Sequence, residues 1–274
     1  MLNKKHIQGL DRNAPIGIFD SGVGGLTVVR AFETFLPDEK LIYFGDTARY
    51  PYGPRSARIV TEFAVQNAEL LAAQGIKLLV VACNTASSVA METVAAAIDI
   101  PLIGVIEPGA RAVIRESKTG RIGVIGTEGT IRSGSYQHAI SELDPIAEYF
   151  TKACPLFVAL AQEGFSGQIV QLVAEHYLAS LKEEQIDSLI LGCTHYPLLI
   201  EDIQAVVGDG VRLVDSAEST VLEVREFLRR KRLLGPDGAG DTRYMVSDAP
   251  ELFREIGERF LQHPIPEVKH IRLR

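Results

Sequence analysis

The chain has 274 residues, of which 46% are hydrophobic and 23% charged, and its formal net charge is −7. This acidic balance argues against nucleic acid as a substrate, and we expect the basic run Arg229–Arg232 to be the solvated end of a helix. The apolar runs are too short to cross a membrane, and the three cysteines accompany no signal peptide, so we expect a cytoplasmic protein.

Short β-rich runs alternate with helical patterns along the chain. The expected strands, in chain order, are 15–19, 41–44, 78–82, 102–105, 122–125, 146–150, 188–192, 211–214 and 244–246. The expected helices are 26–35, 56–74, 85–98, 130–143, 169–184, 198–207, 217–234 and 250–261. Strands such as Leu78–Ala82 are apolar throughout, which is typical of parallel strands buried on both faces. This alternation predicts an α/β fold with mainly parallel sheets.

A weak internal repeat predicts two lobes. The strand and polar turn at Ile16–Gly22 are similar to those at Ile122–Glu128, and the strand end at Cys83 is similar to the one at Cys193, with closely similar spacing. We therefore expect two similar, pseudo-symmetric α/β lobes with the active site in the cleft between them. The expected limits are 15–107 with 215–274 for the first lobe, completed by the C-terminal helices, 108–214 for the second, and 1–14 for a polar N-terminal tail, either loose or ordered. The alternative is one mixed sheet with coincidental similarity.

Cys83 and Cys193 are the candidate catalytic groups. Each follows an apolar strand and precedes small polar residues that begin a helix, at the strand ends where open α/β sheets bind ligands. We expect the positive end of a helix to lower each thiol pKa toward neutrality, as a proton-transferring base requires. Cys154 has no such twin and is expected to be structural. A zinc site built from Cys83, Cys193 and His195, or a redox pair, is a weaker alternative, and we expect no metal.

Polar residues accompany both cysteines. Asp20–Thr27 is a glycine-rich turn between a strand and a helix, which favours an anion site with Asp20 facing the pocket over a plain tight turn. The turn lacks the last glycine of a dinucleotide fingerprint and the lysine of a phosphate loop. The pairs Asn84-Thr85 and Thr194-His195 offer hydrogen bonds to a small zwitterion, and His195 is expected to titrate near neutrality and shuttle protons with Cys193.

Two proton carriers that face one small pocket from different lobes suggest inversion at a carbon centre. One group would remove the α-proton from one face while the other returns a proton to the opposite face. The sequence contains no lysine in a pyridoxal-phosphate setting and no cofactor motif, so we expect no cofactor.

Four segments together closely resemble the glutamate racemases of the aspartate/glutamate racemase superfamily. They are Asp20–Leu26, Gly45–Gly53, Ala82–Ala86 and Leu191–Pro197. The match extends in order and spacing from about residue 15 to 265, whereas residues 1–14 match nothing in the shared core. The resemblance implies an isomerase that converts L-glutamate to D-glutamate for peptidoglycan synthesis without a cofactor.

The resemblance also implies roles for individual residues. It implies Cys83 and Cys193 as the two acid/bases, assisted by Asp20, Glu163 and His195, of which Glu163 is the loosest match. It implies substrate contacts at Asp20, Ser21, Tyr52, Gly53, Asn84, Thr85, Thr194 and His195. A non-catalytic binder of an acidic amino acid and an aspartate racemase stay open as alternatives, and a homodimer is one association state that the sequence leaves open.

Overall fold

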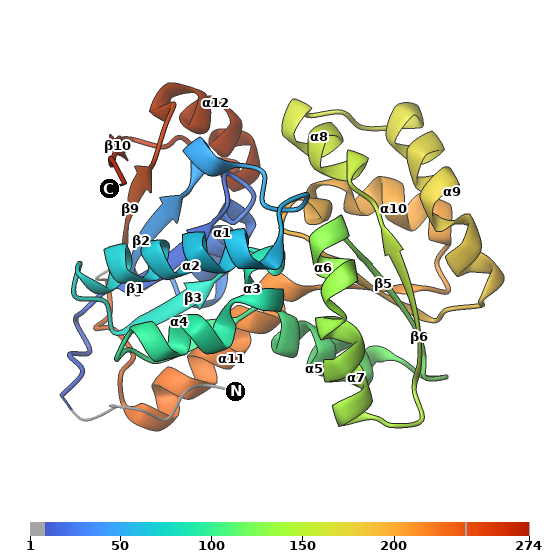
Figure 1. The fold of residues 1–274 in the computed structure, drawn as a ribbon, viewed down its shortest axis with the longest axis horizontal. Coiled ribbons are helices and arrows are strands. Elements are labelled where there is room, and N and C mark those ends of the chain that lie inside the picture. Colours follow the sequence, from blue (N-terminus) through green and yellow to red (C-terminus); the bar gives the residue numbers. More distant parts are fainter. Residues whose placement is uncertain (1–8, 239, 274) are drawn as a thin grey trace.

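Two separate parallel sheets form the centres of two lobes that lie side by side (Figure 1). The computed structural model describes residues 9–238 and 240–273. The first sheet has the order β10-β9-β2-β1-β3-β4, and the second has the order β6-β5-β7-β8. Their strands are β1 (Ile16–Asp20), β2 (Lys40–Gly45), β3 (Leu78–Val81), β4 (Leu102–Gly104), β5 (Arg121–Gly126), β6 (Glu148–Ala153), β7 (Ser188–Gly192), β8 (Arg212–Asp215), β9 (Asp241–Val246) and β10 (Val268–His270). The predicted α/β fold with two mainly parallel sheets is confirmed.

Helices cover both faces of each sheet and bury their apolar sides against it. They are α1 (Leu26–Phe35), α2 (Ala57–Ala72), α3 (Asn84–Val89), α4 (Met91–Ala97), α5 (Ile106–Glu116), α6 (Glu128–Ser133), α7 (Ser135–Leu143), α8 (Leu156–Glu163), α9 (Gln168–Glu183), α10 (Ile200–Val207), α11 (Ser216–Lys231) and α12 (Pro250–Leu261), with short 3-10 turns η1 (Thr47–Arg49) and η2 (Tyr196–Leu199). The strands β3 and β7 each lie between two other strands of their sheet and are buried along their whole length, as the apolar pattern predicted. Among the described residues, no helix has the length and apolar character that crossing a bilayer requires.

The first sheet takes strands from both ends of the chain. Residues 16–104 supply four of its strands and residues 241–270 supply two, whereas the second sheet is built from residues 121–215. The C-terminal segment therefore completes the first lobe with β9 and β10 as well as with helices. We propose the lobe limits stated above, 15–107 with 215–274 and 108–214, on this arrangement.

Some elements differ from the sequence-based expectation. The single helix expected over 85–98 ends and restarts at Ala90, and the one expected over 130–143 does so at Gly134, whose φ of 70° belongs to the left-handed region. Helix α5 was not predicted, because the proline and glycine of Glu107-Pro108-Gly109 suggest an interruption of regular structure between the lobes. Pro108 lies in the first turn of α5, where a missing N–H breaks no helical hydrogen bond. Helix α8 and strand β10 were also not predicted.

The segment before β1 packs against the first lobe. Residues 1–8 of the expected tail lie outside the described residues. Leu10 packs against the core, and the Arg12 guanidinium donates to the carbonyl oxygen of Leu234 at 3.0 Å. The part of the tail that the structure describes is therefore ordered rather than loose.

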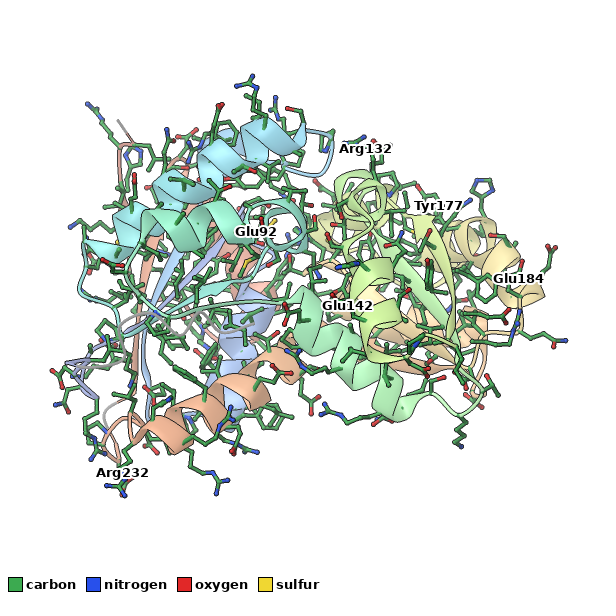
Figure 2. All side chains as sticks on the ribbon, turned by 60° about the horizontal axis from the view of Figure 1, so that its bottom comes forward. Glu92, Arg132, Glu142, Tyr177, Glu184 and Arg232 are labelled. Atoms are coloured by element: carbon green, nitrogen blue, oxygen red, sulfur yellow. The ribbon has the colours of Figure 1, made fainter. Side chains whose placement is uncertain are left out.

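Charged side chains cover the outer surface of both lobes. Figure 2 labels exposed examples: Glu92, Arg132, Glu142, Glu184 and Arg232. The basic run Arg229–Arg232 lies at the exposed end of α11, where Arg229 and Arg230 pair with Glu226, so the prediction of a solvated helix end is confirmed.

Candidate active site

A cavity of about 300 Å³ lies between the lobes and contains both candidate cysteines. Residues from both lobes line it: Ser21, Tyr50, Pro51, Tyr52, Gly53, Pro54, Cys83, Asn84, Thr85, Thr127, Glu128, Pro155, Val158, Ala159, Cys193, Thr194 and His195. The carboxyl ends of β1 and β3 and the carboxyl ends of β5 and β7 all point toward it, as expected for parallel sheets. The fold thus brings together polar residues that are far apart in the sequence.

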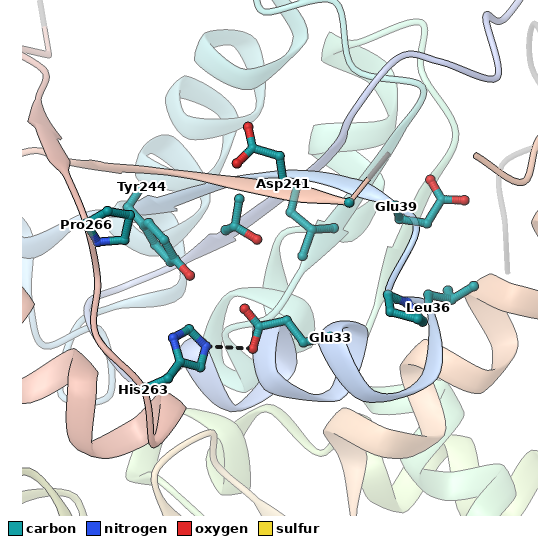
Figure 3. Close-up of a pocket in the computed structure, with 11 residues that line it drawn as sticks. Glu33, Leu36, Glu39, Asp241, Tyr244, His263 and Pro266 are labelled. Atoms are coloured by element: carbon teal, nitrogen blue, oxygen red, sulfur yellow. Dashed lines mark hydrogen bonds and ion pairs between the residues drawn. The ribbon is translucent and has the colours of Figure 1, made fainter. Parts of the chain in front are cut away.

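A second cavity, of about 350 Å³, belongs to the first lobe alone (Figure 3). It lies beside the C-terminal half of α1, β9 and the segment after α12, and the ion pair of Glu33 and His263 spans one side of it, with 3.0 Å between Oε2 and Nε2. Its lining contains no cysteine. The cavity between the lobes is therefore the candidate active site.

Cys83 is the N-cap residue of α3 and is 5% exposed. Burial raises the pKa of its thiol to about 12, and the negative charge of Asp20 adds to this effect. Hydrogen bonds from Ala86 and Ser21 act in the opposite direction but are the smaller effect. The expectation that the helix end would lower this pKa toward neutrality was therefore wrong, because loss of solvent outweighs the helix dipole.

Asp20 ends β1 and is 1% exposed. Its Oδ1 accepts a hydrogen bond from the backbone N–H of Gly22 at 2.9 Å, and its Oδ2 accepts one from Thr194 Oγ1 at 3.5 Å. Burial raises the pKa of its carboxyl group to about 6. A Cβ at Gly24 would overlap the side chains of Thr194 and His195, so this first-lobe turn needs glycine to approach the second lobe.

Cys193 follows β7, and its Sγ lies 3.9 Å from His195 Nδ1. Burial raises the pKa of the Cys193 thiol, and the nearby charges of Cys83 and Asp20 raise it further. The residues after Cys193 form the 3-10 turn η2 before α10 begins, so no α-helix starts directly at this cysteine. As with Cys83, the expected lowering of the thiol pKa was wrong.

His195 is 3% exposed, and burial lowers its pKa to about 4. The expectation that it titrates near neutrality was wrong, since the protein interior disfavours the imidazolium ion. His195 is therefore a neutral imidazole at pH 7. Its Nε2 is buried and has no hydrogen-bond partner among the described residues.

Asn84 and Thr85 begin α3 and face the second lobe. Asn84 Nδ2 donates to the hydroxyl of Tyr136 at 3.0 Å, while Asn84 Oδ1 is buried without a partner among the described residues. Thr85 Oγ1 lies 2.9 Å from Thr127 Oγ1, either of which can be the donor. Tyr136 and Thr127 were not singled out from the sequence as site residues.

A buried carboxylate anchors the loop that carries Tyr52 and Gly53. Asp46 accepts hydrogen bonds from the Tyr52 hydroxyl, from Arg49 Nε at 2.7 Å and from Ser247 Oγ at 3.0 Å. The hydroxyl of Tyr52 thus bonds within its own lobe, and the carbonyl oxygen of Gly53 accepts from the N–H of Gly129 at 2.9 Å. Both residues line the cavity, and their hydrogen bonds fix the position of this wall.

Glu163 does not belong to the cavity. Its side chain is exposed at the end of α8, and its carbonyl oxygen faces Arg259 Nη1 at 3.5 Å. The preceding residue, Gln162, accepts a hydrogen bond from the hydroxyl of Tyr50 at 2.7 Å. The sequence match selected Glu163, but α8 exposes this side chain and brings Gln162 against Tyr50, a residue of the cavity lining.

Comparisons with known proteins show the family to which the chain is similar. Residues 26–224 match the family model described as Asp/Glu/Hydantoin racemase. The chain is 51% identical over 260 residues to a glutamate racemase of Geobacter metallireducens, which covers 94% of this chain and 96% of that protein.

Two solved structures have the same fold over nearly the whole chain. A glutamate racemase isoform from Bacillus anthracis is 40% identical with a TM-score of 0.91, covering 96% of this chain and 98% of that one. The glutamate racemase from Francisella tularensis, solved in complex with D-glutamate, is 40% identical with a TM-score of 0.90 and the same two coverages.

Proposed function

The chain belongs to the Asp/Glu/hydantoin racemase family and is a glutamate racemase, and from this premise we propose that Cys83 and Cys193 are its two acid/bases. The observation that carries the proposal is that these two thiols, one from each lobe, line a single cavity. Inversion requires a proton acceptor on one face of the α-carbon and a proton donor on the other. Thiols that reach the cavity from different lobes can face opposite sides of one bound substrate.

Proton balance assigns different states to the two sulfur atoms. A thiolate on one side takes the α-proton, so that a C–H bond breaks and an S–H bond forms. The thiol on the other side then gives its proton to the carbanion, so that an S–H bond breaks and a C–H bond forms. Reversing the direction exchanges the two roles, which leaves the enzyme ready for the other enantiomer.

Asp20 and His195 supply the means to form a thiolate from buried thiols. With a carboxyl pKa of about 6, Asp20 is ionised at pH 7 and still basic enough to accept a proton on the Cys83 side. Neutral His195, 3.9 Å from Cys193 Sγ, can accept one on the other side. The α-ammonium group of a bound amino acid adds a positive charge that favours the thiolate.

Substrate binding is assigned to seven residues of the lining and to Asp20, which lies near Cys83 but is not among the residues that line the cavity. The seven lining residues are Ser21, Tyr52, Gly53, Asn84, Thr85, Thr194 and His195. The buried, unpartnered atoms Asn84 Oδ1 and His195 Nε2 support this assignment, because a buried polar atom without a partner is costly until a ligand satisfies it. Glu163 is not carried over as a proton-transfer group, since its side chain is exposed.

The biological setting follows from the reaction. D-Glutamate is a building block of peptidoglycan, and a glutamate racemase supplies it. We assign all proton transfers to side chains of the protein, with glutamate as the small-molecule substrate. Action in the cytoplasm, where its three thiols stay reduced, and association as a homodimer remain part of the proposal.

Circular dichroism with L-glutamate in deuterated water tests the two-base proposal. L-Glutamate should lose its signal without added cofactor, whereas L-aspartate should react far more slowly. Early in the reaction, the D-glutamate formed should carry deuterium at the α-carbon, while the remaining L-glutamate should retain protium. Product that keeps the original proton would indicate one base acting on both faces and would refute the proposal.

A further inference from the structure

Tyr136 belongs to none of the sequence motifs, yet its hydroxyl lies directly behind a residue of the cavity wall. It comes from α7 of the second lobe, is 1% exposed, and packs its ring among apolar residues such as Ile106 and Ile140. Its hydroxyl accepts a hydrogen bond from Asn84 Nδ2 at 3.0 Å. Asn84 belongs to the first lobe, so this bond crosses between the lobes.

A third residue completes the cluster. The hydroxyl of Ser216, which begins α11, accepts a hydrogen bond from Asn84 Nδ2 at 3.5 Å. The cluster lies where α3, α5, α7 and α11 meet (Figure 1). Gly109 of α5 closes it from another side, since a Cβ there would lie 3.3 Å from both the Tyr136 hydroxyl and Ser216 Cβ. The polar groups are therefore held in a tightly packed space.

The cluster holds the nitrogen end of the Asn84 carboxamide. The hydroxyl oxygens of Tyr136 and Ser216 both accept a hydrogen bond from Asn84 Nδ2. The other end of the amide, Asn84 Oδ1, is buried and has no hydrogen-bond partner among the described residues. The two hydroxyls therefore determine the orientation of a residue that lines the cavity.

We propose that Tyr136 is a positioning residue for substrate binding: it orients the Asn84 carboxamide, and it makes that orientation depend on how the lobes are placed. Movement of the second lobe away from the first would release the amide. This inference rests on the proposed function, because it takes Asn84 as a substrate contact. Since a contact present before and during the reaction changes binding rather than turnover, its loss acts on KM.

A double-mutant cycle on purified, full-length protein tests this inference. Tyr136→Phe keeps the ring and removes only the hydroxyl, so the fold should persist. We expect it to raise KM for L-glutamate about three- to tenfold, the range that one hydrogen bond of about 1 kcal/mol supports, with kcat nearly unchanged. Asn84→Ala should raise KM at least as much. In the Asn84→Ala background, Tyr136→Phe should have no further effect on KM, because its partner is already gone.

Two further variants separate positioning from general structure. Tyr244→Phe removes another buried tyrosine hydroxyl, in the first lobe and away from the cavity between the lobes, and should leave KM unchanged. Ser216→Ala should raise KM in the same direction as Tyr136→Phe but less. Comparable melting temperatures exclude unfolding as the cause.

Three other results of the double-mutant cycle would each contradict a specific part of the inference. If Asn84→Ala raises KM but Tyr136→Phe does not, the role of Tyr136 is refuted while the assignment of Asn84 stands. If the effects of Tyr136→Phe and Asn84→Ala multiply, Tyr136 acts independently of Asn84 and the inference fails. If Asn84→Ala leaves KM unchanged, both the substrate contact and the inference that rests on it are wrong.

Discussion

Cys83 and Cys193 follow the carboxyl ends of corresponding strands, β3 and β7, in the two sheets, but different side chains lie near them. In the first lobe, β1 pairs with β3 and ends in Asp20, which lies beside Cys83. In the second lobe, β5 pairs with β7 and ends in Gly126, which offers no carboxylate. There, His195 lies 3.9 Å from the sulfur of Cys193.

This difference shows that a pseudo-symmetric backbone can support two unlike proton-transfer partners. Burial raises the pKa of the Asp20 carboxyl group toward pH 7, which makes Asp20 a stronger base, and lowers the pKa of the His195 imidazole, which keeps His195 neutral at pH 7. Burial drives both shifts, in opposite directions, because the carboxylate is charged when deprotonated and the imidazole when protonated. The two lobes therefore place a negatively charged carboxylate near Cys83 and a neutral imidazole near Cys193 at pH 7.

The largest effect is expected from removing either thiol. Cys83→Ala and Cys193→Ala should each abolish racemisation of both enantiomers, a loss of at least about 10³-fold, because each face of the α-carbon would lack its proton carrier. Each variant should still exchange the α-proton of one enantiomer with deuterated water, and the two variants should select opposite enantiomers, as measured by NMR.

Cys154→Ala is the matched control, since Cys154 is buried in the core of the second lobe and does not line the cavity. It should racemise at nearly the wild-type rate. If Cys83→Ala and Cys193→Ala exchanged the α-proton of the same enantiomer, the two thiols would not act on opposite faces of the α-carbon.

A smaller loss is expected from changing the unlike partners. Asp20→Asn and His195→Asn should each lower kcat by about 10²- to 10⁴-fold, the usual contribution of general acid/base assistance. Because the two enantiomers are equally stable, kcat/KM must fall equally in both directions. The difference between the lobes should instead appear in the kinetic isotope effects of α-deuterated L- and D-glutamate, with each variant affecting one enantiomer more. A rise in KM at constant kcat would make these residues binding groups only.

The pH dependence sharpens the comparison further. Asp20 must be ionised to accept a proton, and its pKa of about 6 means that this form is lost below that value. In the wild-type protein, kcat/KM should therefore be constant near pH 7 and fall about tenfold per pH unit below about pH 6. His195, with a pKa of about 4, stays neutral near pH 6 and 7 and does not contribute to this fall of kcat/KM. In Asp20→Asn, this fall of kcat/KM below about pH 6 should be absent. If the fall persists in the variant, it is caused by the titration of another group.

The smallest effects on racemisation are expected from the residues just before β3 and β7, which act on stability instead. Lys77 precedes β3 and forms a fully buried ion pair, with 2.6 Å between its Nζ and Glu39 Oε2. Asp187 precedes β7, is only partly buried, and accepts hydrogen bonds from Ser117 Oγ at 2.7 Å and the N–H of Lys118 at 2.6 Å. Lys77→Met should lower the free energy of unfolding by about 3–5 kcal/mol by leaving Glu39 unpaired. Asp187→Asn should lower it by about 1–3 kcal/mol.

Acid unfolding distinguishes the contribution of Asp187. Partial burial works against ionisation, but hydrogen bonds from Thr119, Ser117 and Ser188 outweigh it and lower the pKa of Asp187 to about 2 from the ordinary 3.8. A lowered carboxyl pKa stabilises the fold above the ordinary value, and this stabilisation is lost as the pH falls toward 2. Urea titrations at pH 7 and pH 3 should show a smaller difference for Asp187→Asn than for wild type. An equal difference would contradict the assignment.

The sequence by itself determined the fold class and the two catalytic candidates. Apolar runs at β3 and β7 specify buried parallel strands, the expected bounds of α1, α12 and β7 agree with the structure, and the matched cysteines mark the strand ends. These features can be predicted locally, because hydrophobic periodicity and turn residues depend only on residues that are close together in the sequence. The resemblance of four segments to glutamate racemases also predicted glutamate as the substrate.

Only the tertiary structure decided the protonation states and the contacts between lobes. Local reasoning gave Cys83 a helix end and a lowered pKa, and gave His195 a pKa near neutrality. Burial by elements far apart in the sequence raises the pKa of Cys83 instead of lowering it, and it lowers the pKa of His195 to about 4. The reason is that desolvation depends on everything that packs around a group. Glu163 and Gln162 are adjacent in sequence, and the orientation of α8 decides which of them meets Tyr50. Tyr136 carries no sequence signal, because its bond to Asn84 exists only once two lobes have packed together.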